Sequence, residues 1–240
     1  PQGLYDFEQE RDACGVGLVA DLKNEPSHKI IEMGITVLKR LMHRGAVGSD
    51  PDTGDGAGIL LALPDEFFRL VLPNKLPARG KYGVAMMFGG CGHEEELEAA
   101  VAENGGSVIA WRQVPVDRDS IGKNAQRTCP LIRQLFIDGS GFADQAEFER
   151  KLFVMRRKME RRVEGCYVCS CSSRSIVYKG LFLGTQIEGF YGDLASEHFK
   201  SPLALVHQRY STNTFPTWSL AHPFRYLAHN GEINTLRGNL

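Results

Sequence analysis

A series of short apolar runs, each bounded by Gly, Pro, Asp or Ser, constrains the fold of this 240-residue chain more than any other feature. The runs are rich in Val, Ile, Tyr and Phe, which is typical of β-strands. Each is far too short to span a bilayer, so the pattern predicts sheets. The runs cover residues 15–22, 57–64, 81–89, 107–115, 130–138, 166–173, 175–182, 203–211 and 224–232.

Helical periodicity appears in three places, at residues 27–44, 93–104 and 144–163. In the first helix we expect Ser27 to be the N-cap. One apolar face should be formed by Ile30, Met33, Val37, Leu38 and Leu41. The third helix contains the basic run "RRKMERR", which could suggest nucleic acid. We favour a solvated helix face, with Phe148, Leu152, Met155 and Met159 packed inward.

Many strands with a few helices predict an α+β protein, with sheets packed face to face and helices outside. No repeat, linker or change of composition divides the chain, so we expect one compact domain. The net charge is −1 and 42% of the residues are hydrophobic, so neither nucleic acid nor a membrane is an expected partner. The first thirteen residues are acidic and lack the apolar core of a secretory signal.

Three cysteines lie close together in "CYVCSC", at Cys166, Cys169 and Cys171. Structural zinc sites usually pair two such clusters, or add a histidine cluster, and no second cluster is apparent. The alternation of the stretch favours a hairpin strand, so we predict no metal site.

The glycine-rich stretch "TGDGAGI", residues 53–59, has several possible interpretations. A phosphate loop would need a Gly-Lys-Ser/Thr sequence and a preceding strand. A calcium loop would need a ligand where Gly54 stands and a Glu where Leu61 stands. We therefore interpret the stretch as a tight loop that allows close approach of the backbone, such as at an active site.

Polar residues in the last forty positions allow two interpretations each. Asn230–Gly231 is typical of a hairpin turn, but an Asn amide beside a Gly N–H also suits an oxyanion hole. Arg209 lies in an apolar run, where its guanidinium could bind a carboxylate or form an internal ion pair. His207, His222 and His229 lack metal-ligand spacing, so we expect them to serve packing or hydrogen bonding.

In "EQERDACGVGLVADL", residues 8–22, a charged stretch changes abruptly to an apolar, glycine-spaced one at Cys14. A nucleophilic cysteine needs a base and an oxyanion stabiliser. If the chain were cut between Ala13 and Cys14, the new α-amine could serve as that base, because such amines titrate at about pH 7.7 to 8.

Four segments together resemble the class II, N-terminal nucleophile (Ntn) glutamine amidotransferase domain of the glutamate synthase family. They are "ACGVGLVADL", "MHRGAVGSDPDTGDGAGI", "HQRYSTNTFPTW" and "LAHNGEINTLRGN", in that order. The resemblance implies a four-layer αββα sandwich of two mostly antiparallel sheets flanked by helices. It also implies a leader or propeptide at 1–13 and an amidotransferase domain at 14–240 that continues past the C-terminal residue.

The resemblance assigns roles residue by residue. Cys14 matches the nucleophile that hydrolyses glutamine to glutamate and ammonia through a thioester, and Asn230 and Gly231 match the oxyanion hole. Arg209 matches the arginine that binds the substrate carboxylate, with Ser211 and Thr212 beside it, while Arg44 and Gly45 match a loop that closes over glutamine. The family's aspartate for the substrate amino group lies beyond residue 240.

In this family the ammonia is used to make glutamate from 2-oxoglutarate, with FMN and a 3Fe–4S cluster in a further synthase domain of the same polypeptide. The electron donor is an NAD(P)H-dependent small subunit or ferredoxin, and the location is cytoplasmic or plastid. Nothing in residues 1–240 resembles a flavin, cluster or metal site. Two alternatives remain: the glutaminase domain of amidophosphoribosyltransferase or glucosamine-6-phosphate synthase, or a non-catalytic glutamine-binding domain in which Cys14 stays unprocessed.

Overall fold

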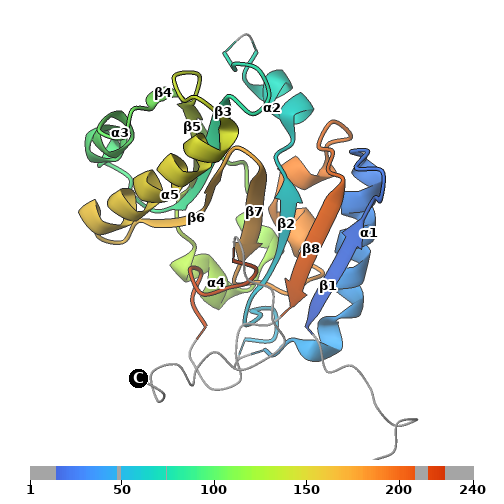
Figure 1. Cartoon of the computed structure of the whole chain (residues 1–240). Coiled ribbons are helices and arrows are strands. Elements are labelled where there is room, and N and C mark those ends of the chain that lie inside the picture. The colour runs from blue at the N-terminus through green and yellow to red at the C-terminus, as the bar shows by residue number, and fades with distance from the viewer. Residues whose placement is uncertain (1–14, 48–49, 74, 209–215, 225–240) are drawn as a thin grey trace, which may run out of the picture.

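Two antiparallel sheets of four strands each form the centre of the molecule (Figure 1). The computed structural model describes residues 15–47, 50–73, 75–208 and 216–224. The first sheet has the order β1 (Val16–Ala20), β8 (Leu203–Gln208), β2 (Ala57–Ala62) and β7 (Ser175–Gly180). The second sheet has the order β4 (Ser107–Gln113), β5 (Ile132–Asp138), β3 (Tyr82–Phe88) and β6 (Tyr167–Ser172).

These strands confirm the prediction for every apolar run from residue 15 to residue 208. The remainder of the run at 203–211 lies outside the described residues, as does the run at 224–232 after Phe224. A short turn between Ser172 and Ser175 joins β6 to β7 and so connects the two sheets. The stretch "CYVCSC" is therefore a strand, as predicted, but the expected hairpin was wrong, because β6 and β7 belong to different sheets and pair with other strands.

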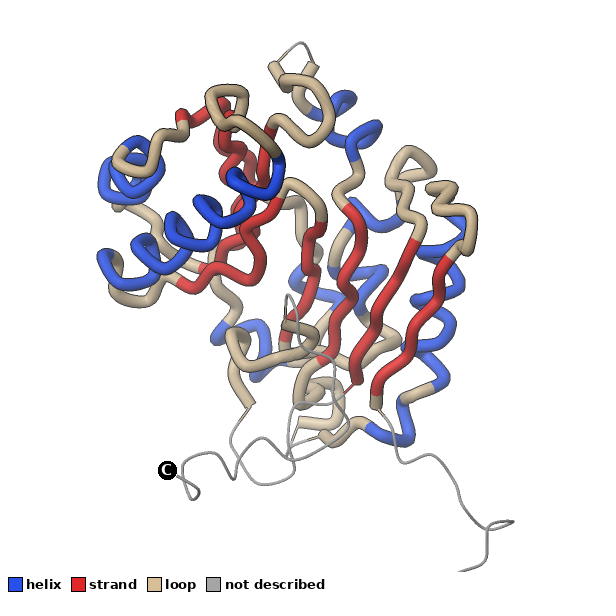
Figure 2. Tube along the Cα trace, in the orientation of Figure 1, coloured by secondary structure: helices blue, strands red, loops and turns tan. Residues whose placement is uncertain are grey.

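Helices flank both sheets (Figure 2). The predicted ones are α1 (His28–Arg40), α3 (Glu94–Ala102) and α5 (Gln145–Arg162). The first packs on the first sheet, and the other two cover one face of the second. Shorter elements were not predicted, because fewer than two turns carry little periodicity. They are α2 (Asp65–Val71), α4 (Lys123–Thr128), α6 (Ile187–Phe190) and the 3₁₀ turns η3 (Arg118–Ser120) and η4 (Gly192–Ala195). A further 3₁₀ turn, η2 (Met42–Arg44), lies within the helical range predicted at 27–44.

The predicted details of α1 were partly wrong. Ser27 is the N-cap residue, as predicted, but its side chain makes no capping hydrogen bond, and its backbone pairs with Ser201. The buried face contains Ile31 and Ile35 in place of Met33, which is 44% exposed. The face is rotated because Gly34 brings the helix axis close to β8, where a Cβ on Gly34 would lie 2.6 Å from the Ala204 side chain.

The inward face of α5 was predicted correctly, since Phe148, Leu152, Met155 and Met159 are all buried. The Asp144 carboxylate caps the helix by accepting a hydrogen bond of 2.7 Å from the Glu147 N–H. The basic residues after Met155 are partly used in ion pairs within the same helix, such as Arg157 with Glu160 at 2.8 Å. This arrangement confirms the interpretation of a solvated helix face.

One apolar core joins the two sheets, and a second lies under α3 and α5. The first combines Ile59 and Tyr178 of the first sheet with Val84 and Phe136 of the second. Together the two antiparallel sheets and their flanking helices form the αββα sandwich expected from the sequence. No helix among the described residues is long and apolar enough to cross a membrane.

Candidate functional site

The ends of two strands that adjoin candidate residues in the chain meet at one edge of the first sheet. The backbone N–H of Gln208, the last residue of β8, donates a hydrogen bond of 2.7 Å to the carbonyl of Gly15, which precedes β1. A Cβ on Gly15 would clash with the Gln208 carbonyl oxygen. Peptide bonds join Cys14 to Gly15 and Arg209 to Gln208. Cys14 and Arg209 themselves lie outside the described residues.

The side chain of Gln208 connects this edge with the loop that follows α1. Its amide is fully buried. A Cβ on Gly45 would clash with the Gln208 Nε2, and one on Gly184 would lie 2.5 Å from the Oε1. The absence of side chains at these glycines therefore lets the loop containing Arg44 and Gly45 pack directly on the end of β8. Of the predicted site residues, these two are the ones described, and Gly45 packs on the Gln208 side chain.

The loop from Ala46 to Asp55 is closed at its base. The Ala46 N–H donates to the Asp55 carboxylate at 3.1 Å, and the Asp55 N–H donates to the Ala46 carbonyl at 3.0 Å. Asp50 braces the loop by accepting hydrogen bonds from the Asn124 N–H and the Thr53 hydroxyl. These hydrogen bonds, with that from Asn124 contributing most, lower the pKa of the Asp50 carboxyl. The carboxylate therefore serves loop structure.

The glycines of "TGDGAGI" allow close backbone contacts, as predicted for a tight loop. A Cβ on Gly54 would lie 2.6 Å from the Phe182 carbonyl oxygen, and one on Gly58 would lie 2.5 Å from the His222 carbonyl oxygen. Gly56 has a φ of +128°, a conformation that L side chains rarely adopt. The prediction of a close approach is confirmed: the backbone at Phe182 approaches Gly54, and the chain between residues 216 and 224 approaches Gly56 and Gly58.

Two of the three histidines have the packing role expected for them. The rings of His207 and His222 are buried and stack with their centroids 4.5 Å apart. The third, His229, lies outside the described residues. Asn230, Gly231, Ser211 and Thr212 also lie there, so the proposed oxyanion hole and the residues beside Arg209 remain predictions.

The three cysteines of "CYVCSC" do not converge on a common point. Cys169 belongs to the core between the sheets, whereas Cys166 and Cys171 belong to the core under α3 and α5. Burial raises the pKa of Cys166 to about 11 and that of Cys169 to about 12, which suits thiols used for packing. In the described parts of the chain, no three His, Cys, Asp or Glu side chains form a possible metal site. These residues therefore do not fit a zinc ion or an iron–sulfur cluster.

Sequence reasoning missed two fully buried polar side chains next to this edge, Gln208 and Lys179. Lys179 stands in the apolar run 175–182, just as Arg209 stands in the run 203–211. The signal that singled out Arg209, a cation within a strand that should be buried, could also have identified the lysine.

Replacing Gly15 by alanine should lower the stability of the domain by about 1–3 kcal/mol, because the added Cβ would push β1 and β8 apart. Glutaminase activity should fall with it if Cys14 acts from this edge. Gly141→Ala is the control, since a Cβ there would meet nothing within 4 Å. Equal denaturant midpoints for the two variants would contradict the close contact at Gly15.

The sequence of this chain matches the family of class-II glutamine amidotransferases over residues 14–240. It is 51% identical to the large chain of the NADPH glutamate synthase of Bacillus subtilis, over the whole of this chain and 16% of that protein. It is 44% identical to the corresponding chain of Azospirillum brasilense, over 98% of this chain and 16% of that protein.

A plant protein shows similar coverage. The ferredoxin-dependent glutamate synthase 1 of Arabidopsis thaliana is 39% identical over 99% of this chain and 16% of the relative. The chain therefore spans about a sixth of the length of these curated relatives. The match to the family extends from Cys14 through the edge at Gly15, Gly45 and Gln208 to the C-terminal segment. The chain belongs to the class-II glutamine amidotransferases.

Proposed function

We propose that this chain hydrolyses L-glutamine to L-glutamate and ammonia, with Cys14 as the nucleophile. The hydrogen bond between Gly15 and Gln208 supports the proposal most directly, because Cys14 and Arg209 are the chain neighbours of that pair. Consecutive Cα atoms are about 3.8 Å apart, so a nucleophile and a carboxylate-binding arginine at these positions would lie within reach of one small substrate. Gly45, packed on Gln208, supports a role for Arg44 and Gly45 in covering that substrate.

In the proposed reaction the Cys14 thiolate attacks the carboxamide carbon of glutamine. The side-chain amide of Asn230 and the N–H of Gly231 donate hydrogen bonds to the oxyanion of the tetrahedral intermediate. The α-amine of Cys14 takes the thiol proton and gives it to the departing nitrogen, so ammonia leaves and a γ-glutamyl thioester remains. Water then attacks the thioester, which releases glutamate and restores the thiol.

This role for the α-amine requires that residues 1–13 be removed as a leader, leaving 14–240 as amidotransferase domain. The family match begins at Cys14, which supports this boundary. An α-amine is half protonated at about pH 7.7 to 8, so it can accept and return a proton near neutrality. An uncut bond between Ala13 and Cys14 would leave an amide in its place, and the chain could then bind glutamine without hydrolysing it.

In the whole protein we propose that the ammonia converts 2-oxoglutarate to glutamate. The names of the relatives, which specify glutamate synthases dependent on NADPH, NADH or ferredoxin, support this assignment over a sugar-phosphate acceptor. FMN and a 3Fe–4S cluster would be held by a synthase domain of the same polypeptide, supplied with electrons by an NAD(P)H-dependent small subunit or by ferredoxin. The location would be cytoplasmic, or plastid in a plant or alga. Glutamine-dependent formation of glutamate from labelled 2-oxoglutarate tests this part.

Replacing Arg209 by alanine should mainly raise the KM for glutamine. Loss of a charge-assisted hydrogen-bonded contact costs about 1.5–3 kcal/mol, which corresponds to a KM increase of roughly 10- to 100-fold. Arg209→Lys should restore only part of the affinity, because an ammonium cannot bind a carboxylate through two parallel hydrogen bonds. Steady-state glutaminase kinetics would check this, with Arg157→Ala on the exposed face of α5 as a control. A KM equal to that of the wild type would move carboxylate binding elsewhere.

A further inference from the structure

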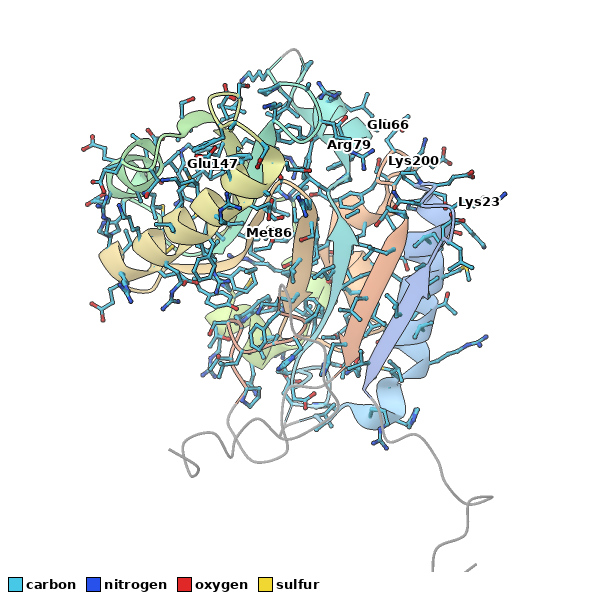
Figure 3. All side chains as sticks on the ribbon, in the orientation of Figure 1. Lys23, Glu66, Arg79, Met86, Glu147 and Lys200 are labelled. Carbon is cyan, nitrogen blue, oxygen red and sulfur yellow. The ribbon has the colours of Figure 1, made fainter. Side chains whose placement is uncertain are left out.

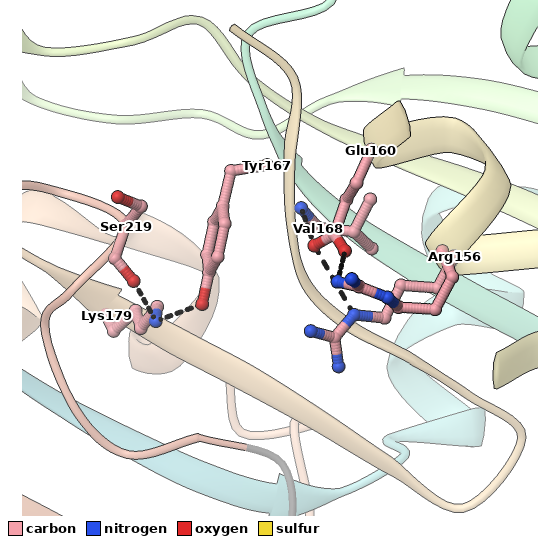
Figure 4. A network of polar contacts seen from close by, with 7 residues as sticks. Arg156, Glu160, Tyr167, Val168, Lys179 and Ser219 are labelled. Carbon is pink, nitrogen blue, oxygen red and sulfur yellow. Dashed lines mark hydrogen bonds and ion pairs between the residues drawn. The ribbon is translucent and has the colours of Figure 1, made fainter. Parts of the chain in front are cut away.

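A lysine is completely buried beside the candidate site. Lys179 lies on β7, opposite Gly58 of β2. Its ammonium donates three hydrogen bonds, to the Tyr167 hydroxyl at 2.8 Å, the Ser219 carbonyl at 2.9 Å and the Ala221 carbonyl at 2.7 Å. Figure 4 shows the first two of these contacts from nearby. An ammonium has three N–H donors, so every donor of this lysine is used.

All three hydrogen-bond partners are electrically neutral. The ammonium also lies 4.7 Å from the centre of the Tyr167 ring and 4.5 Å from that of Phe224, positions that favour a cation. The nearby Glu160 carboxylate is engaged with Arg156 and with the Val168 N–H (Figure 4). Burial lowers the pKa of Lys179 to about 8, so at pH 7 most of the lysine still carries its charge.

The lysine holds a segment that has little regular structure of its own. We call residues 216–224 the anchored segment. Its internal backbone hydrogen bonds run from Leu220 and Ala221 to the Thr217 carbonyl, and within the described residues Lys179 is the donor to its Ser219 and Ala221 carbonyls. A buried carbonyl left without a donor is costly, so the lysine determines where these two residues lie.

Glycines on the neighbouring strands bring the anchored segment into register with the lysine. Gly58 leaves room for the His222 carbonyl and Pro223, and Gly56 leaves room for Ala221. At the other end, a Cβ on Gly180 would lie 2.5 Å from the Trp218 ring, whose Nε1 donates to the Thr128 hydroxyl at 3.3 Å. The segment is thus pressed against β2 and β7, with Lys179 as its cationic anchor.

The proposed carboxylate-binding arginine and the proposed oxyanion donors follow different described elements in the chain. Arg209 directly follows β8, which pairs with both β1 and β2 along its length. Asn230 and Gly231 follow the anchored segment after residues 225–229. In the chain, the proposed oxyanion donors thus continue from the anchored segment, whereas the proposed carboxylate-binding arginine continues from β8.

We propose that Lys179 is a positioning residue, which fixes the anchored segment and through it the oxyanion donors Asn230 and Gly231. This inference rests on the proposed glutaminase function. Its structural half, that the lysine immobilises residues 216–224, does not depend on activity. The two halves can therefore be tested separately on the same protein.

The first test is hydrogen–deuterium exchange of the intact protein, comparing the wild type with Lys179→Met. Methionine keeps an unbranched apolar stem but donates no hydrogen bond. Amides of the anchored segment should exchange at least about tenfold faster in the variant, whereas those of α1 and α5 should keep their rates. The control is Lys200→Met. Lys200 also donates hydrogen bonds, to the exposed Glu66, at the opposite end of the first sheet from Gln208 (Figure 3).

The second test is the kinetics of glutamine hydrolysis. In Lys179→Met, kcat should fall by about 10- to 100-fold, the effect of a small misplacement of catalytic groups, with KM changed by less than about threefold. Gly58→Ala should produce the same combination, because its Cβ would lie 2.5 Å from the His222 carbonyl oxygen and 2.6 Å from the Lys179 Cβ, and would therefore displace both. This second variant disturbs the contact between Lys179 and the anchored segment without removing the ammonium.

Several results of these two tests would overturn the proposed role of Lys179. Unchanged exchange of residues 216–224 in Lys179→Met would overturn the proposal, as would faster exchange with an unchanged kcat. Exchange in α5 that is accelerated in Lys179→Met as much as exchange in the anchored segment would also contradict it, because the lysine would then support the whole sandwich. A wild-type protein without glutaminase activity would refute the proposed function, and the exchange result would still report on the anchoring.

Discussion

Replacement of Cys14 by alanine should abolish glutaminase activity while leaving the fold intact. The alanine variant lacks the thiolate that forms the γ-glutamyl thioester, and loss of a nucleophile costs on the order of a millionfold in kcat in comparable covalent mechanisms. Cys14→Ser should also be inactive within the sensitivity of an ordinary assay, because a hydroxyl is a much weaker nucleophile near neutral pH. Ammonia release measured with a coupled dehydrogenase would check both variants.

The matched control is Cys91→Ala, which removes a thiol that is exposed on a glycine-rich turn. Its activity should equal that of the wild type. The melting temperatures of all variants should agree within a few degrees, because Cys14 comes before the first strand, β1, in the chain and is not one of the strand residues that form the core. Full activity in Cys14→Ala would end the assignment of the nucleophile.

Replacement of Asn230 by alanine should lower kcat by about 100- to 1,000-fold, the usual effect of removing one oxyanion-hole donor. The KM for glutamine should change little, since the oxyanion exists only after attack. Gly231 would still donate its backbone N–H, so a residual activity above that of Cys14→Ala is expected. Asn124→Ala is a suitable control, because that asparagine lies on the exposed side of α4.

The alternative for Asn230–Gly231 is a hairpin turn without a catalytic role. In that case Asn230→Ala would change stability and leave kcat within about threefold of the wild type. Replacing Asn230 by aspartate separates the interpretations further. Aspartate also favours such turns, but its carboxylate would repel an oxyanion, so only a catalytic role predicts a loss of rate.

Much of the fold could be predicted because strands of this kind carry their signal locally. The runs that became β1 to β8 are short, apolar and bounded by turn residues, and α5 has a long regular apolar face. The rotation of α1 could not be predicted, since it depends on Gly34 fitting against Ala204, a residue 170 positions away in the chain. Short helices such as α6 depend in the same way on contacts made only in the folded state.

For the candidate site, too, some residues could be predicted from the sequence, whereas their contacts could not. Residue types suggested the nucleophile, the carboxylate-binding arginine and the tight glycine loop. The partners of these residues could not be derived from local pattern, because packing of Gly45 on Gln208 and the anchoring of Ser219 by Lys179 join distant segments. The role of Lys179 was not predicted, because a single cation in an apolar strand does not reveal which carbonyls will surround it.

We propose above that glutaminase activity requires a chain that begins at Cys14. Intact mass spectrometry of the purified, glutaminase-active protein tests it directly. The account predicts that the active species has lost residues 1–13, and that a preparation retaining them has no activity until it is cut. An active protein whose mass still includes residues 1–13 would contradict the account, because Cys14 would then carry an amide where the mechanism requires an amine.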